Sequence, residues 1–346
     1  MAWRAEPALH AGVPGVATIT SRGEHFVGHI PAELAGRRLD QALAALLPAY
    51  SRSRLQQWIR AGQVRVDTRR PRPDERVRGG ERVEVDALIE EDKGCLAQAI
   101  PLTLVYEDDS LLVIDKPSGL VVHPAAGNRD GTLQNALLHH VPELAALPRA
   151  GLVHRLDKDT TGLLVVARTL AAHKCLVEQL QARAVEREYQ AVVAGVMTAG
   201  GTVEGAMGRH PTARTRMAVT RGGKPAVTHY RVMERYRAHT LIRVRLETGR
   251  THQIRVHMAH IHHPLLGDPV YGGRMRLPKG CGERLRTALA GFKRQALHAA
   301  RLALIHPASG ERMEWRAPLP PDMARLIEVL REDARDLEHG AGSRAE

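Results

Sequence analysis

One nine-residue stretch contains an unusual density of groups that can do chemistry. Residues 154–162 have the sequence HRLDKDTTG, which combines the carboxylates of Asp157 and Asp159 with cations and hydroxyls. A carboxylate in such a setting can act as a nucleophile or as a general base. The same residues also fit a structural turn, in which either aspartate caps a backbone amide and Arg155 pairs with one of them. Spacing alone does not separate these two interpretations.

The segment after this stretch is suited to hold it in place. Residues 163–167 form the continuous apolar run LLVVA, which predicts a central strand that is buried on both faces. A buried strand fixes the loop that leads into it, as a reactive side chain requires.

Other segments of this half of the chain also have clear patterns. Thr132, Thr169 and Thr251 each precede a helical pattern and can cap it. Residues 186–193 predict a strand in which Tyr189 faces away from Val192, so that Tyr189 need not belong to the core.

Two long strands are predicted over residues 228–236 and 240–247. In the second, apolar residues such as Ile242 alternate with arginines such as Arg243, which predicts a hairpin with one polar face.

The charge of the chain indicates a polyanionic partner. The 346 residues carry a formal net charge of +12, and 43 of the 50 basic residues are arginine. This balance favours nucleic acid over a membrane surface, and the planar guanidinium suits phosphate. A genome-wide preference for arginine codons would also produce the excess. Aromatic residues make up only 3%, which argues against an extended base-stacking sheet.

Cysteine usage and hydropathy indicate the compartment. The three cysteines are widely spaced and form no disulfide framework or paired metal motif. No apolar run has the length of a signal or transmembrane segment. We therefore expect a cytoplasmic protein with no membrane association.

Basic residues are concentrated near the N-terminus. Residues 37–85 contain 12 arginines and six acidic residues, so this segment carries half of the net charge. Two short helical patterns and two short strands accompany the charge, and Gly62 is placed to end the second helix. Residues 38–40, 51–55 and 62–66 resemble the S4-type RNA-binding domain. An ordinary solvated basic face is the alternative.

The chemically dense stretch resembles the catalytic motif of the RluA/RluD-type pseudouridine synthases, and other motifs of that family follow in the same order. The matching segments are residues 111–124, 154–167, 249–258, 267–273 and 294–299. Within the family, the strongest resemblance is to enzymes that act on the helix 69 stem-loop of 23S rRNA. The supporting segments are residues 106–108, 122–124, 226–231 and 267–273.

The resemblance implies a role for individual residues. Asp157 is the expected catalytic carboxylate, and Arg255 is expected to pair with it and favour its charged form. Tyr189 and Leu297 are expected to pack against the target base. From the pattern alone, a space-filling tyrosine fits position 189 equally well, and a plain core leucine fits position 297 better. Arg155 is a candidate wedge or phosphate contact. In the S4-like module, the candidate RNA contacts are Arg38, Arg52, Arg54 and Arg65.

The resemblance also implies a fold and a reaction. We expect an α+β protein with an S4-like module and a catalytic domain on a mostly antiparallel mixed sheet with flanking helices and a central cleft. The expected divisions are a mobile segment 1–25, the S4-like domain 26–86, a linker 87–101, the catalytic domain 102–338 and a mobile tail 339–346. The expected reaction isomerises uridine to pseudouridine in rRNA by a monomer without a cofactor, because no redox change or energy source is involved.

Three other interpretations compete. A glycosidase would need a second acid, for which Asp159 is the nearest candidate. The histidines between residues 252 and 263 suggest zinc, but they lack the His-Glu-x-x-His pattern and a cysteine partner. An RNA-binding assembly factor with an inactive synthase domain would share the basic module, but it would not require Asp157, Tyr189 and Arg255 together.

Overall fold

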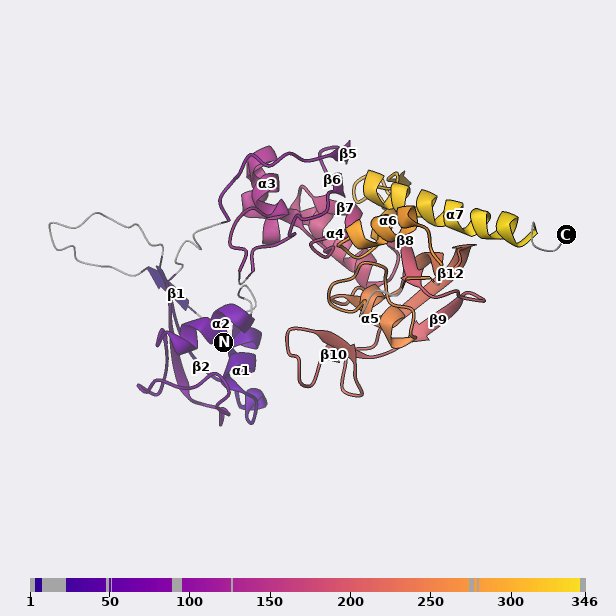
Figure 1. Cartoon of the computed structure of the whole chain (residues 1–346). Coiled ribbons are helices and arrows are strands. Elements are labelled where there is room, and N and C mark those ends of the chain that lie inside the picture. The colour runs from indigo at the N-terminus through magenta and orange to yellow at the C-terminus, as the bar shows by residue number, and fades with distance from the viewer. Residues whose placement is uncertain are drawn as a thin grey trace, which may run out of the picture. The chain divides into compact units, whose positions relative to one another are not determined.

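The computed structural model describes residues 4–7, 23–47, 50, 52–88, 95–125, 127–273, 277–278 and 280–342 (Figure 1). The chain divides into two compact units, Met1–Gly94 and Cys95–Glu346. The boundary falls inside the segment that we predicted as a linker. Beyond it, the side chain of Asn135 donates a hydrogen bond of 2.7 Å to the carbonyl of Leu96, so the end of the predicted linker is part of the second unit.

The first unit is a four-stranded antiparallel sheet packed against two short helices. In spatial order the strands are β1 (Arg4–Pro7), β2 (Gly23–His29), β4 (Arg82–Leu88) and β3 (Val64–Val66). The helices α1 (Leu39–Leu46) and α2 (Arg52–Arg60) bury their apolar faces on this sheet, after the short 3-10 helix η1 (Ala32–Leu34).

Two predictions about the first unit have different outcomes. Gly62 follows α2 with a φ of +76°, a left-handed conformation that glycine adopts without strain, as predicted for the end of this helix. The predicted mobile segment 1–25 contains β1 and the start of β2, and its residues 1–3 and 8–22 lie outside the described residues.

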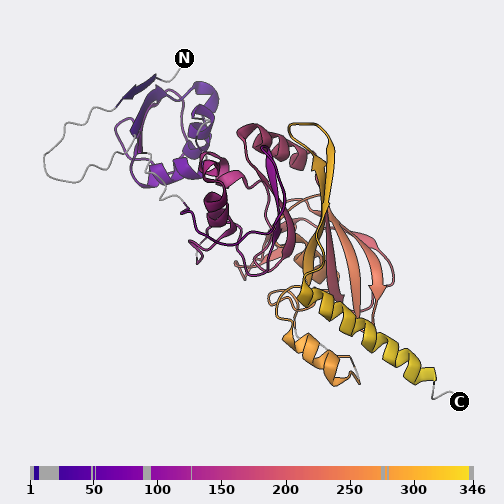
Figure 2. The same cartoon turned by 90° about the horizontal axis from the view of Figure 1, so that it is seen from above.

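A nine-stranded mixed sheet organises the second unit (Figure 2). Its path is β5 (Leu104–Glu107), β6 (Leu111–Lys116), β7 (Thr161–Ala167), β14 (Leu297–Ile305), β8 (Glu186–Ala194), β13 (His239–Leu246), β12 (Val227–Arg235) and β9 (Gly201–Glu204), and β15 (Arg312–Arg316) pairs with β14. Within the described part of this sheet, β7 and β14 pair in parallel and the other pairs are antiparallel. The predicted mostly antiparallel mixed sheet is confirmed, and all seven residues of β7 are buried, as the apolar run indicated.

Helices pack on several parts of this sheet. They are α3 (Leu133–His140), α4 (Leu170–Gln181), α5 (Gln253–His260), α6 (Glu283–Gly291) and α7 (Pro321–Gly342), with the 3-10 helices η2 (Pro142–Ala146) and η3 (Pro148–Gly151) after α3. α6 and α7 lie side by side (Figures 1 and 2) and share a core with Val192 and Leu241. No helix in the described part of the chain is long and apolar enough to span a membrane. A small hairpin of β10 (Met207–Arg209) and β11 (Met217–Val219) stands apart from the main sheet.

The helix starts show which local predictions hold. Thr132 forms a capping box with Asn135, and Thr169 accepts a hydrogen bond of 3.1 Å from the amide of Ala172. The prediction for Thr251 is wrong, because α5 starts one residue later, after His252. His252 has a φ of +57° and makes no side-chain cap, so its imidazole is free for other contacts.

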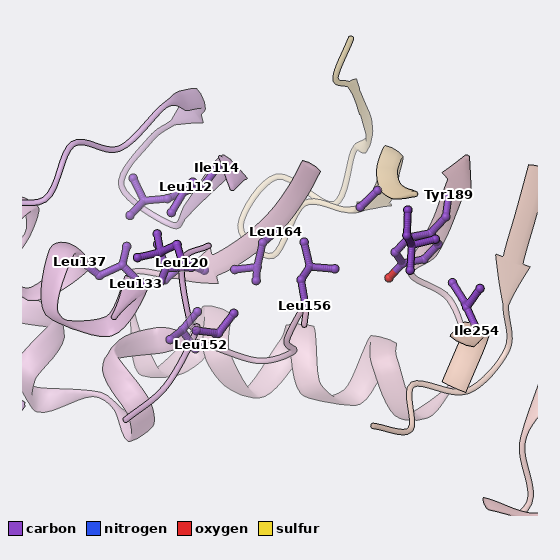
Figure 3. Close-up of a cluster of buried hydrophobic side chains, with 14 of the residues drawn as sticks. Leu112, Ile114, Leu120, Leu133, Leu137, Leu152, Leu156, Leu164, Tyr189 and Ile254 are labelled. Atoms are coloured by element: carbon purple, nitrogen blue, oxygen red, sulfur yellow. The ribbon is translucent and has the colours of Figure 1, made fainter. Parts of the chain in front are cut away.

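The largest core cluster connects the sheet to residues 154–162, the loop that carries Asp157. Figure 3 shows Leu133 and Leu137 at one end of the drawn cluster and Tyr189 with Ile254 at the other, with Leu164 between them. Tyr189 is only 5% exposed, so the prediction that it need not be core is wrong. The predicted alternation holds nevertheless, because Val192 belongs to a different cluster.

Candidate active site

A cleft of about 840 Å³ in the second unit brings together the residues predicted from separate motifs. Its walls include Arg155, Asp157, Tyr189, Arg255 and Leu297. Arg155 is exposed at the cleft, whereas Tyr189 and Leu297 are buried, at 5% and 4% exposed. The predicted central cleft is therefore present, with an aromatic ring and an aliphatic side chain in its wall.

A buried lysine holds the loop that carries Asp157. The Nζ atom of Lys116, at the end of β6, donates hydrogen bonds to the carbonyls of Pro117 at 2.7 Å, Leu120 at 3.0 Å and Lys158 at 2.8 Å. Burial lowers the pKa of Lys116 to about 8, against the opposing effect of nearby aspartates. Lys116 thus connects the matching segment 111–124 to Lys158, the residue directly after Asp157.

The other end of the loop is held by the segment that precedes β14. The side chain of Gln295 donates to Thr160 Oγ1 at 3.1 Å, and Arg294 Nη1 donates to the carbonyl of Asp159 at 3.2 Å. These bonds join segments about 135 residues apart in the chain. Arg294 and Gln295 were not predicted to be functional, because nothing in the local sequence indicates their partners.

Close backbone approach fixes the strand behind the loop. A Cβ on Gly162 would lie 2.3 Å from the carbonyl oxygen of Ala299, so only glycine lets β7 approach β14 here. The Nε2 atom of His154 accepts a hydrogen bond of 3.1 Å from the amide of Val165. Burial lowers the pKa of His154 to about 3, which keeps the ring neutral and able to accept.

Asp157 is held by a buried arginine that also binds a second carboxylate. Arg255 Nη1 donates to Asp157 Oδ2 at 3.0 Å, as the resemblance implied. The same guanidinium donates from Nε to Asp268 Oδ2 at 2.7 Å and from Nη2 to Asp268 Oδ1 at 2.9 Å. Both carboxylates raise the pKa of Arg255, outweighing its burial. One fixed cation therefore positions Asp157 while a fully buried carboxylate orients that cation.

Sequence analysis did not identify Asp268, although its turn was noted. Its side chain has no exposed surface, and it also accepts hydrogen bonds from the amides of Val270 at 2.8 Å and Tyr271 at 3.0 Å. Burial alone would raise the pKa of Asp268, but the bonds from Arg255 and the amides outweigh it and lower the pKa. An aspartate followed by proline in a glycine-rich turn was the available signal, but it did not reveal the partner.

His252 lies near the other oxygen of Asp157. Its Nε2 atom is 3.9 Å from Asp157 Oδ1, and its Nδ1 atom is 2.8 Å from the hydroxyl of Tyr271. That hydroxyl also accepts the amide hydrogen of Met217 at 3.0 Å. Burial lowers the pKa of His252, which favours the neutral imidazole.

The histidine cluster is divided among unrelated contacts. His257 bonds to Thr228 Oγ1 at 2.9 Å, and His263 Nδ1 lies 2.8 Å from the carbonyl of Ala194. No three histidine, cysteine or acidic side chains in the described ranges are grouped so that they could hold a metal ion.

Among the described residues of the cleft wall, there is no suitable second acid for glycosidase chemistry. Asp159 is not among the residues of the cleft wall, where Asp157 and Glu247 are the carboxylates. The hydrogen bond with His229 lowers the pKa of Glu247, so it is a poor proton donor.

In the first unit, two of the arginines predicted to contact RNA also bind a buried carboxylate. Arg38 and Arg52 donate to Asp40 at 2.9–3.3 Å, and the side chain of Gln56 donates to it as well. Burial tends to raise the pKa of Asp40, but these donors lower it overall. The side chains of Arg38 and Arg52 remain 42% and 45% exposed. Arg65 is exposed on β3 between two buried valines, and the side chain of Arg54 lies outside the described residues.

Known proteins share both units of this chain. Residues 110–260 match the model of the RNA pseudouridylate synthase family, and residues 37–83 match the S4 domain. The ribosomal large subunit pseudouridine synthase D of Escherichia coli O157:H7 is 61% identical over 299 residues, which cover 86% of this chain and 92% of the relative. The protein of the same name from Pseudomonas aeruginosa is 59% identical over 304 residues, covering 88% and 95%. Among solved structures, human RNA pseudouridylate synthase domain containing 4 matches with a TM-score of 0.51 and 26% identity, over 66% of this chain and 93% of that one.

The chain belongs to the RNA pseudouridylate synthase family and carries an S4 domain before its synthase domain. It is an RNA pseudouridine synthase, and the resemblance noted in the sequence is confirmed.

Proposed function

We propose that this enzyme isomerises uridine to pseudouridine in the 23S rRNA of the large ribosomal subunit, with the helix 69 stem-loop as its target. The names of relatives that are 59–61% identical over at least 92% of their length support the ribosomal substrate. The S4 domain and the net charge of +12 suit a large RNA. We infer further that the enzyme acts as a monomer in the cytoplasm, and that it needs no cofactor because the reaction involves no redox change or energy source.

The observation that carries the mechanism is the fixed carboxylate of Asp157, bound to Arg255 and facing a cleft lined by Tyr189 and Leu297. The C1′–N1 bond of the uridine breaks, the uracil turns, and a C1′–C5 bond forms. The proton on C5 is then lost and N1 gains one, so atoms and charge balance. Asp157 assists either by adding to C1′ or by taking a proton from the sugar.

The target base must leave its stack before it reaches Asp157, which costs roughly a few kcal/mol. Tyr189 and Leu297 offer a dry surface on which the uracil can pack. Arg155 is exposed at the cleft and forms no ion pair with the described residues, so it is available to fill the vacated space or to contact a phosphate.

Pseudouridine mapping of rRNA from cells with and without this protein tests the substrate. Carbodiimide labelling followed by primer extension should lose its stops in helix 69 when the protein is absent. Loss at another rRNA position would replace the proposed target. An unchanged rRNA map would point first to other RNA substrates, and only then to the inactive assembly factor.

Paired substitutions in the catalytic loop test the mechanism. Asp157→Asn should abolish release of tritium from RNA labelled at uridine C5, while RNA affinity and the melting temperature stay nearly unchanged. Asp159→Asn is the matched control, because this neighbouring carboxylate is outside the cleft wall, and it should retain turnover. Turnover by Asp157→Asn would remove this residue from the mechanism.

A further inference from the structure

Arg187 is a buried cation without a partner among the described residues. It lies in β8, two residues before Tyr189, and is 8% exposed. Its Nε atom has no hydrogen-bond partner, and no carboxylate of the described residues forms an ion pair with it. The other two buried arginines in the described part of the chain, Arg255 and Arg294, each bind an aspartate through two nitrogens.

The guanidinium of Arg187 is placed at the cleft. Arg187 and Tyr189 both line it, as expected for residues two apart on one strand. A Cβ on Gly249, also in the cleft wall, would lie 2.8 Å from Arg187 Nη1. The absence of a side chain at Gly249 is therefore what lets the guanidinium occupy this position.

The carboxylates of the cleft wall are already engaged elsewhere. Asp157 binds Arg255, and Glu247 binds both Arg183 and His229. The positive charge of Arg187 acts on the neighbouring His154, where it adds to the effect of burial in lowering the pKa of the imidazole. Burying an arginine without a partner is costly, so the position favours a ligand that brings its own negative charge.

We propose that Arg187 binds a non-bridging phosphate oxygen of the RNA, at the phosphodiester next to the flipped uridine. This inference rests on the proposed function, since it requires RNA in the cleft. The planar guanidinium matches phosphate geometry and can donate two hydrogen bonds to it. Two residues along a strand are about 6.6 Å apart. A base on Tyr189 and its phosphate on Arg187 therefore fit the dimensions of a single nucleotide.

The test combines a protein change with a matching RNA change. Arg187→Gln should raise the Kd and KM for a helix 69 stem-loop RNA by about 10- to 100-fold, the usual range for a bond to a charged group. A methylphosphonate at the phosphate on the 5′ or the 3′ side of the target uridine removes the charge from the RNA. At the phosphate that Arg187 binds, the methylphosphonate should raise the Kd of the wild type by a similar factor. It should raise the Kd of Arg187→Gln little further.

A control variant separates this contact from general charge. Arg284→Gln also removes one positive charge, from the exposed side of α6 outside the cleft wall, and should leave Kd and KM within about twofold. Arg187→Lys keeps the charge without the planar fork and should recover only part of the loss.

Thermal melting separates a binding role from a structural one. Because Arg187 has no partner in the described structure, Arg187→Gln should leave the melting temperature unchanged or raise it. A lower melting temperature of Arg187→Gln would overturn the inference. So would a loss of affinity from the methylphosphonate that is the same in the wild type and in Arg187→Gln at both phosphates. Turnover of the unmodified stem-loop by the wild type tests the proposed function separately. The effect of Arg187 on phosphate binding is measured as a change in Kd, which does not depend on turnover.

Discussion

The buried pair of Arg255 and Asp268 makes a strong prediction about stability and turnover together. Replacing Asp268 with asparagine keeps the shape of the side chain but removes its charge. The NH2 group of asparagine cannot accept a hydrogen bond, so the donors of Arg255, Val270 and Tyr271 no longer all find an acceptor.

The size of the effect follows from burial. The side chains of Arg255 and Asp268 are 6% and 0% exposed, and removing one partner of a buried pair costs about 3–5 kcal/mol. Arg255 keeps Asp157, and asparagine keeps one acceptor oxygen, so we expect the lower end, about 3 kcal/mol. For a unit of this size the melting temperature should fall by about 6–12 °C. Since Arg255 is then free to shift against Asp157, kcat should fall about 100-fold.

Calorimetry and a single-turnover tritium-release assay measure the two effects. Asp322→Asn is the matched control: it breaks a two-bond pair with Arg294 at 2.7 and 2.8 Å, but Asp322 is 50% exposed. Because Asp322 is half exposed, breaking this pair should cost less than breaking the fully buried pair. Equal losses in the two variants, or normal turnover in Asp268→Asn, would refute the reasoning.

The pH dependence has a definite sign. The folded structure lowers the pKa of Asp268, so the unfolded chain binds more protons at acidic pH. The stabilisation is present above the ordinary aspartate value of about 3.9 and is lost as the pH falls through the folded-state value. The stability difference between the wild type and Asp268→Asn should therefore shrink below about pH 4.

Further predictions concern three other features. Lys116→Met should destabilise the fold by about 3 kcal/mol, because three carbonyls lose their donor. The lowered pKa of Lys116 also means that wild-type stability, relative to Lys116→Met, should rise from pH 8 to about 10.4 in urea titrations. In the S4 domain, Arg65→Gln should reduce the salt dependence of RNA binding without changing the melting temperature. Arg38→Gln should lower the melting temperature, because Asp40 loses a hydrogen-bond donor. Activity should survive exhaustive EDTA treatment, and a loss restored by zinc would revive the histidine-cluster interpretation.

Local patterns were reliable where the cause is local. The cap residues Thr132 and Thr169 and the buried strand β7 were all predicted, because capping and hydrophobic periodicity act over a few neighbouring residues. The cap predicted at Thr251 was wrong, because the helix begins only after His252. His252 has a left-handed backbone conformation, and its side chain contacts Tyr271. A contact across 19 residues leaves no trace in the local pattern.

Charge was the least reliable guide to role. Arg38 and Arg52 belong to a conspicuous basic cluster, but both bind Asp40 inside their own unit. Arg187 attracted no notice in the sequence, although it is the unpaired buried arginine of the described cleft. Residue type shows that a cation is present, but only its neighbours in space show whether its charge is already compensated.

The sequence by itself determined the class of protein, the S4-like and synthase domains, and the cleft residues Asp157, Tyr189, Arg255 and Leu297. Only the tertiary structure decided that Asp268 orients the Arg255 that holds Asp157, and that Lys116 binds the carbonyl of the residue after Asp157. The physical reason is that secondary structure depends on near neighbours, whereas hydrogen bonds and ion pairs depend on distances of a few ångströms between residues as many as 198 positions apart. Those distances exist only after the strands have paired.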